Sequence, residues 1–260
     1  MGLFRNAMAS IGIGSAKVDT ILDNDRVQVG SPVTGRISLK GGKIEQKIDN
    51  IYLEVRTEYK QESEDDDDEY TLTDTVQKIT IPIGQAIAPK QQANIPFQFI
   101  LSSEVPITMG KTKVWIHTGL DIKRAIDPTD KDYIEVLPHP YMQVVLNAFQ
   151  ILGFQIREVE NESVNSTSEK EFVQEFEFVP KSGMFKGYLD ELEVVFAIYN
   201  DGIKLWLEID RKARGLKGLF AEVFDMDETK TNLGIYVQDL QKGPEYIAEN
   251  LGEFIQSYLK

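Results

Sequence analysis

The sequence contains no cysteine and only two histidines, His117 and His139. Without cysteine there is no disulfide scaffold, no thiol nucleophile and no thiolate metal site. Two histidines are too few for a three-histidine zinc site, and they leave little material for a Ser–His–Asp triad. The composition therefore argues against nucleophilic and zinc-dependent enzymes, and we expect a protein without catalytic residues, cofactor or metal.

Positive charge and long hydrophobic runs are also scarce. The formal net charge is −14, which argues against binding a nucleic-acid backbone, because phosphates require clustered cations. No hydrophobic run approaches the roughly 18 residues of a membrane-spanning helix. Residues 3–13 are interrupted by Arg5, Asn6 and Ser10 and lack the pattern of a secretory signal. We therefore expect a cytoplasmic protein that neither binds nucleic acid nor inserts stably into a membrane.

What the chain does contain is a series of short segments in which apolar and polar residues alternate. This alternation is typical of half-buried antiparallel strands, and the glycines and prolines between the segments mark turns. The segments are 16–22, 26–39, 44–59, 71–83, 94–101, 111–118 and 133–137 in the first half, and 154–159, 171–179, 191–199, 203–210 and 233–237 in the second. Many short strands without interleaved helices predict β-sandwiches rather than an α/β sheet.

Three segments have helical periodicity instead. Residues 1–14 form a short amphipathic pattern, Pro140 suits the first turn of a helix, and Pro244 opens a closing segment with an apolar stripe that we expect to cover a sheet. We predict a mainly β fold of two antiparallel β-sandwich domains. Its parts are an N-terminal helix at 1–14, a sandwich at 15–138, a connecting helix at 139–153 and a second sandwich with a terminal helix at 154–260.

Two features of the first half resemble the amino-terminal sandwich of arrestin-like proteins. They are Gly30-Ser31-Pro32-Val33-Thr34-Gly35 within one strand, and a second strand at 95–101 followed by Val105-Pro106. The chain also resembles the stage-zero protein M family of bacterial sporulation-control proteins. The matching stretches are 16–20, 45–49, 111–122, 137–140, 210–216 and 225–229. The resemblance implies an arrestin-like fold and a cytoplasmic regulator of spore formation in Gram-positive bacteria, without catalytic residues.

A basic cluster in the acidic second half is the first candidate for partner binding. It consists of Arg211, Lys212, Arg214 and Lys217. Four cations close together suit an acidic partner or an anionic membrane face. The alternative is that they pair with the acidic residues Glu222, Asp225, Asp227 and Glu228 just downstream, as neighbouring surface charges commonly do.

Trp115 and His117 are the second candidate, because they share one face of a predicted strand. They would form an aromatic, titratable docking surface near Asp121. The alternative is that Trp115 is packed and His117 hydrogen-bonds a neighbouring strand. A hydrolase using His117 and Asp121 has little support, because no nucleophile motif accompanies them.

The acidic loop at 62–69 is the remaining unusual segment. Its carboxylates are suitable calcium ligands, but the spacing of a calcium-binding helix–loop–helix motif is missing. The alternative is a solvated loop whose like charges repel one another. We therefore predict a non-enzymatic cytoplasmic adaptor that controls sporulation or cell-cycle decisions by binding other proteins. The alternative function is a small-ligand or Ca²⁺-binding β-sandwich protein that uses residues 62–69.

Overall fold

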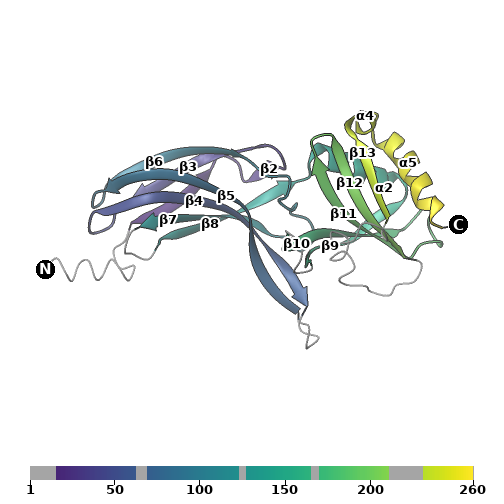
Figure 1. Cartoon of the computed structure of the whole chain (residues 1–260), viewed down its shortest axis with the longest axis horizontal. Helices are drawn as coiled ribbons and strands as arrows, with labels where there is room; N and C mark the ends of the chain where they lie inside the picture. Colours follow the sequence, from purple (N-terminus) through teal and green to yellow (C-terminus); the bar gives the residue numbers. More distant parts are fainter. Residues whose placement is uncertain (1–15, 63–68, 123–126, 165–169, 211–230, 260) are drawn as a thin grey trace. The chain divides into compact units, whose positions relative to one another are not determined.

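The computed structural model describes residues 16–62, 69–122, 127–164, 170–210 and 231–259. The predicted N-terminal helix, the basic cluster and most of the acidic loop lie outside these residues. The chain divides into two compact units (Figure 1). Unit 1 comprises residues 1–57, 75–105 and 113–137, and unit 2 comprises residues 58–74, 106–112 and 138–260. The mainly β fold predicted from the sequence is confirmed.

Unit 1 is a sandwich of two sheets. The first sheet has the order β1-β3-β6, and the second contains β4-β7-β8-β2, with β5 paired to β4. The bounds are β1 (Lys17–Leu22), β2 (Arg26–Gln28), β3 (Pro32–Lys40), β4 (Gln46–Glu62), β5 (Glu69–Ile87), β6 (Gln92–Ile100), β7 (Val114–Ile122) and β8 (Thr129–Leu137). β4 and β5 contribute residues to both units, because β4 continues beyond Thr57 and β5 begins before Thr75.

The core of unit 1 follows from the alternation seen in the sequence. Ile37 from the first sheet and Leu53, Ile116 and Leu120 from the second are completely buried. Gly35 lies where β3 meets both of its neighbours, since a Cβ there would lie 2.5 Å from the Ile21 carbonyl oxygen and 2.9 Å from Phe97 Cζ. The sequence therefore needs glycine at this point of the predicted strand.

The described strands of unit 2 form one sheet with the order β13-β12-β11-β10-β9. All four pairs of neighbours are antiparallel. The bounds are β9 (Phe154–Ser163), β10 (Phe172–Pro180), β11 (Glu191–Tyr199), β12 (Gly202–Asp210) and β13 (Thr231–Tyr236). The Asn200-Asp201-Gly202 turn closes the β11–β12 hairpin, where Tyr199 pairs with Gly202.

Helix α2 (Pro140–Ile151) packs on this sheet and supplies part of the core of unit 2. Phe149 is completely buried, stacks on Phe178 of β10 at 4.4 Å between ring centroids, and meets Phe154 edge-on. His139 is the N-cap residue before the helix, and its Nδ1 accepts a hydrogen bond from the Tyr141 backbone N–H at 3.2 Å. Burial lowers the pKa of His139. This histidine therefore has a structural role as a helix cap.

The closing helix α5 (Pro244–Ser257) follows the short helix α4 (Val237–Leu240). Its main contacts are with α2 and α4 rather than with the strands on which we expected it to lie. Ile247, Leu251 and Ile255 are buried along its inner stripe. Each such side chain contributes about 1.5–3 kcal/mol on burial, before ordering costs.

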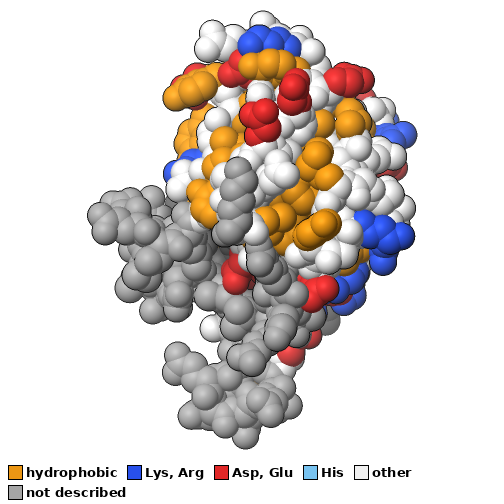
Figure 2. All heavy atoms as spheres, turned by 90° about the vertical axis from the view of Figure 1, so that its right-hand side faces the viewer, with side chains coloured by type: hydrophobic (Ala, Val, Ile, Leu, Met, Phe, Trp, Pro, Cys, Tyr) orange, Lys and Arg blue, Asp and Glu red, His pale blue; other side chains and the backbone are white. Residues whose placement is uncertain are grey.

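Part of the helical side of unit 2 is apolar and exposed. Ile151, at the end of α2, and Tyr258, just after α5, are each 52% exposed. Figure 2 shows hydrophobic side chains on this side of the molecule, with acidic side chains beside them. None of the helices within the described ranges has the length and apolar character needed to cross a membrane.

Candidate functional site: an aromatic face and a carboxylate face

Trp115 lies on β7 directly opposite Tyr133 of β8, and the two rings are tilted with centroids 6.0 Å apart. Lys131 covers both rings, with its Nζ 3.9 Å from the Trp115 centroid and 4.6 Å from the Tyr133 centroid. Trp115 is only 4% exposed, whereas Tyr133 is 56% exposed. Trp115 is therefore packed, as in the structural alternative given above, and an incoming molecule would meet Tyr133 and Lys131 first.

His117 belongs to the same face of β7, between Glu54 of β4 and Lys131 of β8 in the strand register. Its pKa is lowered, mainly by burial and then by the positive charge of Arg56. The carboxylate that the sequence placed near it, Asp121, accepts hydrogen bonds from Asn50 Nδ2 at 3.2 Å and Tyr52 Oη at 3.3 Å. His117 is therefore held neutral at neutral pH, and Asp121 is engaged with β4 rather than positioned as its acid–base partner.

Glu54 connects this face to two cations. Its Oε1 lies 2.7 Å from Nζ of Lys78 on β5, and its carboxylate also forms an ion pair with Arg56. Burial raises the pKa of Glu54, but the hydrogen bonds from Lys78 and Arg56 outweigh this effect and leave the pKa lowered. Glu54 is therefore ionised at neutral pH, and the positive charges of Lys78 and Arg56 balance its negative charge. We call the six residues Glu54, Arg56, Trp115, His117, Lys131 and Tyr133 the aromatic face.

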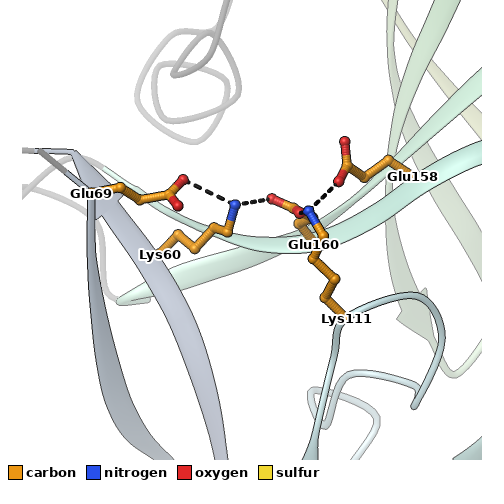
Figure 3. Close-up of polar contacts among 5 residues, drawn as sticks. All are labelled: Lys60, Glu69, Lys111, Glu158 and Glu160. Carbon is orange, nitrogen blue, oxygen red and sulfur yellow. Dashed lines mark hydrogen bonds and ion pairs between the residues drawn. The ribbon is translucent and has the colours of Figure 1, made fainter. Parts of the chain in front are cut away.

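A second group of charges lies in unit 2, where the ends of β4 and β5 approach β9 (Figure 3). Lys60 Nζ lies 2.9 Å from a carboxylate oxygen of Glu69 and 2.6 Å from one of Glu160. Lys111 Nζ, from the segment before β7, lies 2.5 Å from Glu158 and also contacts Glu160. Glu160 therefore bridges two lysines that come from separate parts of the chain.

These contacts are at one end of a row of glutamates that crosses the sheet. The register places Glu158 opposite Glu177, Glu177 opposite Glu193 and Glu193 opposite Glu208. A second row pairs Glu160 with Glu175. Like charges directly opposite each other destabilise a sheet, so this arrangement carries an electrostatic cost. We call these six glutamates, together with Glu162, the carboxylate face.

The electrostatic cost of these facing glutamates is reflected in their pKa values. Burial and the neighbouring glutamates, Glu193 first among them, raise the pKa of Glu175 to about 8. Burial and the hydrogen bond that protonated Glu162 donates to Glu160 raise the pKa of Glu162 to about 7. Burial also acts to raise the pKa of Glu160, but its hydrogen bonds with Lys111 and Lys60 outweigh this and hold it at about 2. Protonated and ionised carboxyls therefore stand side by side on this face.

Sequence reasoning missed the carboxylate face, although its signal is visible. Glutamates alternate along 158–162, recur at 171–177 and alternate again at 191–193. Each strand alone looks like an ordinary solvated face, and only the pairing of the strands brings the rows together. In the part of the chain that the structure describes, no group of three or more histidine, aspartate or glutamate side chains is arranged to hold a metal ion.

The two remaining predicted sites are the basic cluster and the acidic loop. Arg211, Lys212, Arg214 and Lys217 lie outside the described residues. From the acidic loop, the described side chain of Glu69 is paired with Lys60, while residues 63–68 lie outside the described ranges.

Comparisons with known proteins identify close relatives. A family model described as "SpoOM protein" matches residues 4–213. The sporulation-control protein spo0M of Bacillus subtilis (strain 168) is 39% identical over 259 residues, which is 99% of each chain. A crystal structure of Spo0M, the sporulation control protein of Bacillus subtilis, superposes with a TM-score of 0.86 at 38% identity, covering 95% of this chain and all of that one.

Proposed function

Because the chain belongs to the SpoOM protein family, we propose that it is a non-enzymatic regulator of sporulation that acts in the cytoplasm by binding other proteins. The full-length similarity to a sporulation-control protein supports the regulatory role. The scarcity of histidine and the lack of cysteine support a role without catalysis.

The observation that carries this proposal is the exposed pair Lys131 and Tyr133 over the buried Trp115. Tyrosine is common at the energetic centre of protein interfaces, because it adds a large contact area with little loss of conformational freedom. Here the ring of Tyr133 is already ordered by Trp115 and Lys131, which reduces the entropy lost on binding. The aromatic face is therefore suited to contact another protein.

The partner would meet cations on this face. Lys131 lies over the rings, and Arg56 and Lys78 lie next to Glu54 in the same sheet. On a chain with a net charge of −14, a locally cationic and aromatic surface favours an acidic protein partner and gives the contact an orientation. The basic cluster Arg211, Lys212, Arg214 and Lys217 is also cationic, although it contains no aromatic residue, and is a second proposed contact.

The experiment is capture of partners from sporulating cells by crosslinking and mass spectrometry. A variant carrying Lys131→Glu and Tyr133→Ala should lose partners that the wild type recovers, and should complement a deletion of the chromosomal copy poorly. Tyr199→Ala is the matched control, because Tyr199 is 51% exposed but lies in unit 2. If Tyr133 is a hot spot of the interface, its truncation should weaken binding by about 2 kcal/mol, or roughly 30-fold.

A third variant separates the two proposed surfaces. Changing Arg211, Lys212, Arg214 and Lys217 to glutamate should remove partners that contact the basic cluster and leave those of the aromatic face. If all three variants recovered the wild-type partners and restored normal sporulation, both surfaces would be excluded. Melting temperatures close to that of the wild type are required for each variant, so that misfolding does not imitate loss of binding.

A further inference from the structure

Three lysines gather at one end of the first sheet of unit 1, where β3 leads into β4 and β5 into β6 (Figure 1). Lys17 is the first residue of β1 and Lys40 the last of β3, and the register places them directly opposite each other. Lys40 also lies opposite Gln92, the first residue of β6, and Lys90 precedes that strand by two positions. All three lysines are exposed. We call Lys17, Lys40 and Lys90 the lysine patch.

Backbone hydrogen bonds hold Lys90 next to the end of β3. The Gly41 N–H donates to the Gln91 carbonyl oxygen at 2.8 Å. In the other direction, the Lys90 N–H donates to the carbonyl oxygens of Gly41 and Gly42, each at 3.2 Å. Because Gly41 directly follows Lys40, the position of Lys90 relative to β3 is fixed by the fold.

The lysine patch is kept at two structural costs. Within the described ranges, Lys90 is the only residue other than glycine with a positive φ, which is +63°. It occupies the third position of a turn that the Gln91 N–H closes onto the Ala88 carbonyl oxygen at 3.1 Å, where glycine or asparagine is usual. Lys17 and Lys40 place like charges directly opposite each other, which destabilises a strand pair. A strained lysine that is retained indicates a function for its charge.

Acidic side chains do not neutralise the lysine patch. Among the residues that the structure describes, none forms an ion pair with Lys17, Lys40 or Lys90. Asp19 follows Lys17 on the same side of β1, but the register places it opposite Ser38. The patch therefore remains cationic on a chain whose net charge is −14.

The patch also lies next to the point where the described residues begin, at Ala16. The sequence before this point contains Arg5 and no acidic residue. It has the amphipathic pattern noted above, whose apolar positions are Leu3, Phe4, Ala7, Met8 and Ile11. An apolar stripe is thus joined through Lys17 to a group of uncompensated cations.

An apolar segment and a cationic patch are the two signals that together hold a protein reversibly on an anionic bilayer, where either one alone binds weakly. We propose that the lysine patch lies on an anionic phospholipid surface and that residues 1–14 supply the apolar contact, so that unit 1 binds a membrane reversibly. The open position of the patch at the strand ends suits a flat, extended surface. An acidic protein would match the lysines but would not require the apolar stripe beside them.

Sedimentation with vesicles tests the role of the charges. The full chain should bind vesicles of mixed phosphatidylglycerol and phosphatidylcholine, and should bind pure phosphatidylcholine much more weakly. High salt should reduce the difference. Lys40→Gln and Lys90→Gly should each lower the partition coefficient about five-fold, and the double variant about 25-fold. Lys181→Gln is the matched control at an exposed lysine of unit 2 and should bind as the wild type does.

Lys90→Gly also separates binding from folding. Glycine adopts a φ of +63° without the steric cost that lysine has. The variant should therefore melt at or above the temperature of the wild type while it binds anionic vesicles more weakly. Weaker binding accompanied by a lower melting temperature would assign Lys90 to the fold and overturn its role in the patch.

The absence of cysteine from the chain allows a site-specific test of the apolar contact. An environment-sensitive fluorophore on Met8→Cys should shift its emission to the blue when anionic vesicles are added. The same label on Tyr199→Cys, at an exposed position of unit 2, should not shift. Equal binding to both kinds of vesicle, wild-type binding by the double lysine variant, or an unshifted label at position 8 of the bound protein would each overturn the proposal.

Discussion

Glu175 of β10 lies directly opposite Glu160 of β9, and their proton affinities are split in opposite directions. The pKa of Glu160 is held at about 2 by Lys111 and Lys60 against the effect of burial, whereas burial and neighbouring glutamates raise that of Glu175 to about 8. The sheet therefore accommodates the facing carboxyls by keeping one charged and the other protonated.

This split predicts a pH-dependent stability. The usual pKa of the Glu175 carboxyl is 4.5, so between about 4.5 and 8 the folded protein holds a proton that the unfolded chain has released. The contribution of Glu175 to the free energy of unfolding is greatest below pH 4.5 and falls as the pH rises to 8, by at most about 1.4 kcal/mol per pH unit. Glu175→Gln should remove this slope and gain stability at pH 8, as measured by urea unfolding. Parallel pH profiles for the variant and the wild type would contradict this assignment.

The lysine bridge predicts a second shift. Lys111→Met removes the ion pairs of this exposed lysine with Glu158 and Glu160, so the pKa of Glu160 should rise from about 2, as followed by NMR of its side-chain carboxyl. The melting temperature should fall, and the difference from the wild type should shrink at high salt, because exposed ion pairs are screened. Lys181→Met, at an exposed lysine of the same unit, is the control and should leave Glu160 unchanged.

Two glycines of unit 1 should respond oppositely to the same substitution. Gly35→Ala places a Cβ 2.5 Å from the Ile21 carbonyl oxygen, and should cost about 1–3 kcal/mol of unfolding free energy through overpacking. Gly119→Ala on β7 meets no atom within 4 Å, and should be neutral or slightly stabilising because alanine restricts the unfolded chain. Chemical denaturation measures both. Equal losses at the two positions would show that the close approach of β3 to β1 is not what requires Gly35.

The closing helix should be held by its buried stripe. Leu251 is completely buried, so Leu251→Ala should destabilise the protein by about 2–5 kcal/mol. The exposed Glu249, two residues earlier on the same helix, provides the control substitution Glu249→Ala, which should change stability by less than about 0.5 kcal/mol. Equilibrium unfolding in urea distinguishes the two. A small effect at Leu251 would mean that α5 contributes little to the stability of unit 2.

The sequence predicted strands well where apolar and polar residues alternate regularly. Val18, Thr20 and Leu22 alternate and form β1, and the turn at Asn200–Gly202 closes a hairpin as expected. The predicted strand at 111–118 instead begins at Val114, because Gly110 with φ +62° turns the chain before it. β5 extends beyond the predicted 71–83 at both ends. Its pairing with β4 stabilises the extended conformation of flanking residues whose sequence alone does not predict a strand.

The candidate sites were less predictable. The alternation of Trp115 and His117 correctly placed both on one strand face, but it could not show that Tyr133 and Lys131 cover Trp115, because these residues come from a neighbouring strand. The carboxylate rows were hidden for the same reason. Glu177, Glu193 and Glu208 are far apart in the chain, and only the register of three strands brings them together.

The sequence by itself determined the local properties of this protein: its alternating strands, the helices that begin at Pro140 and Pro244, and the lack of thiol chemistry. These depend on residue type and on spacing within a few positions, where backbone geometry allows few solutions. The tertiary structure alone decided which side chains face one another, and therefore which glutamates are protonated and which aromatic ring is buried. Those properties depend on pairings between distant segments, and a shift of one residue in register would exchange the buried and exposed faces of a strand.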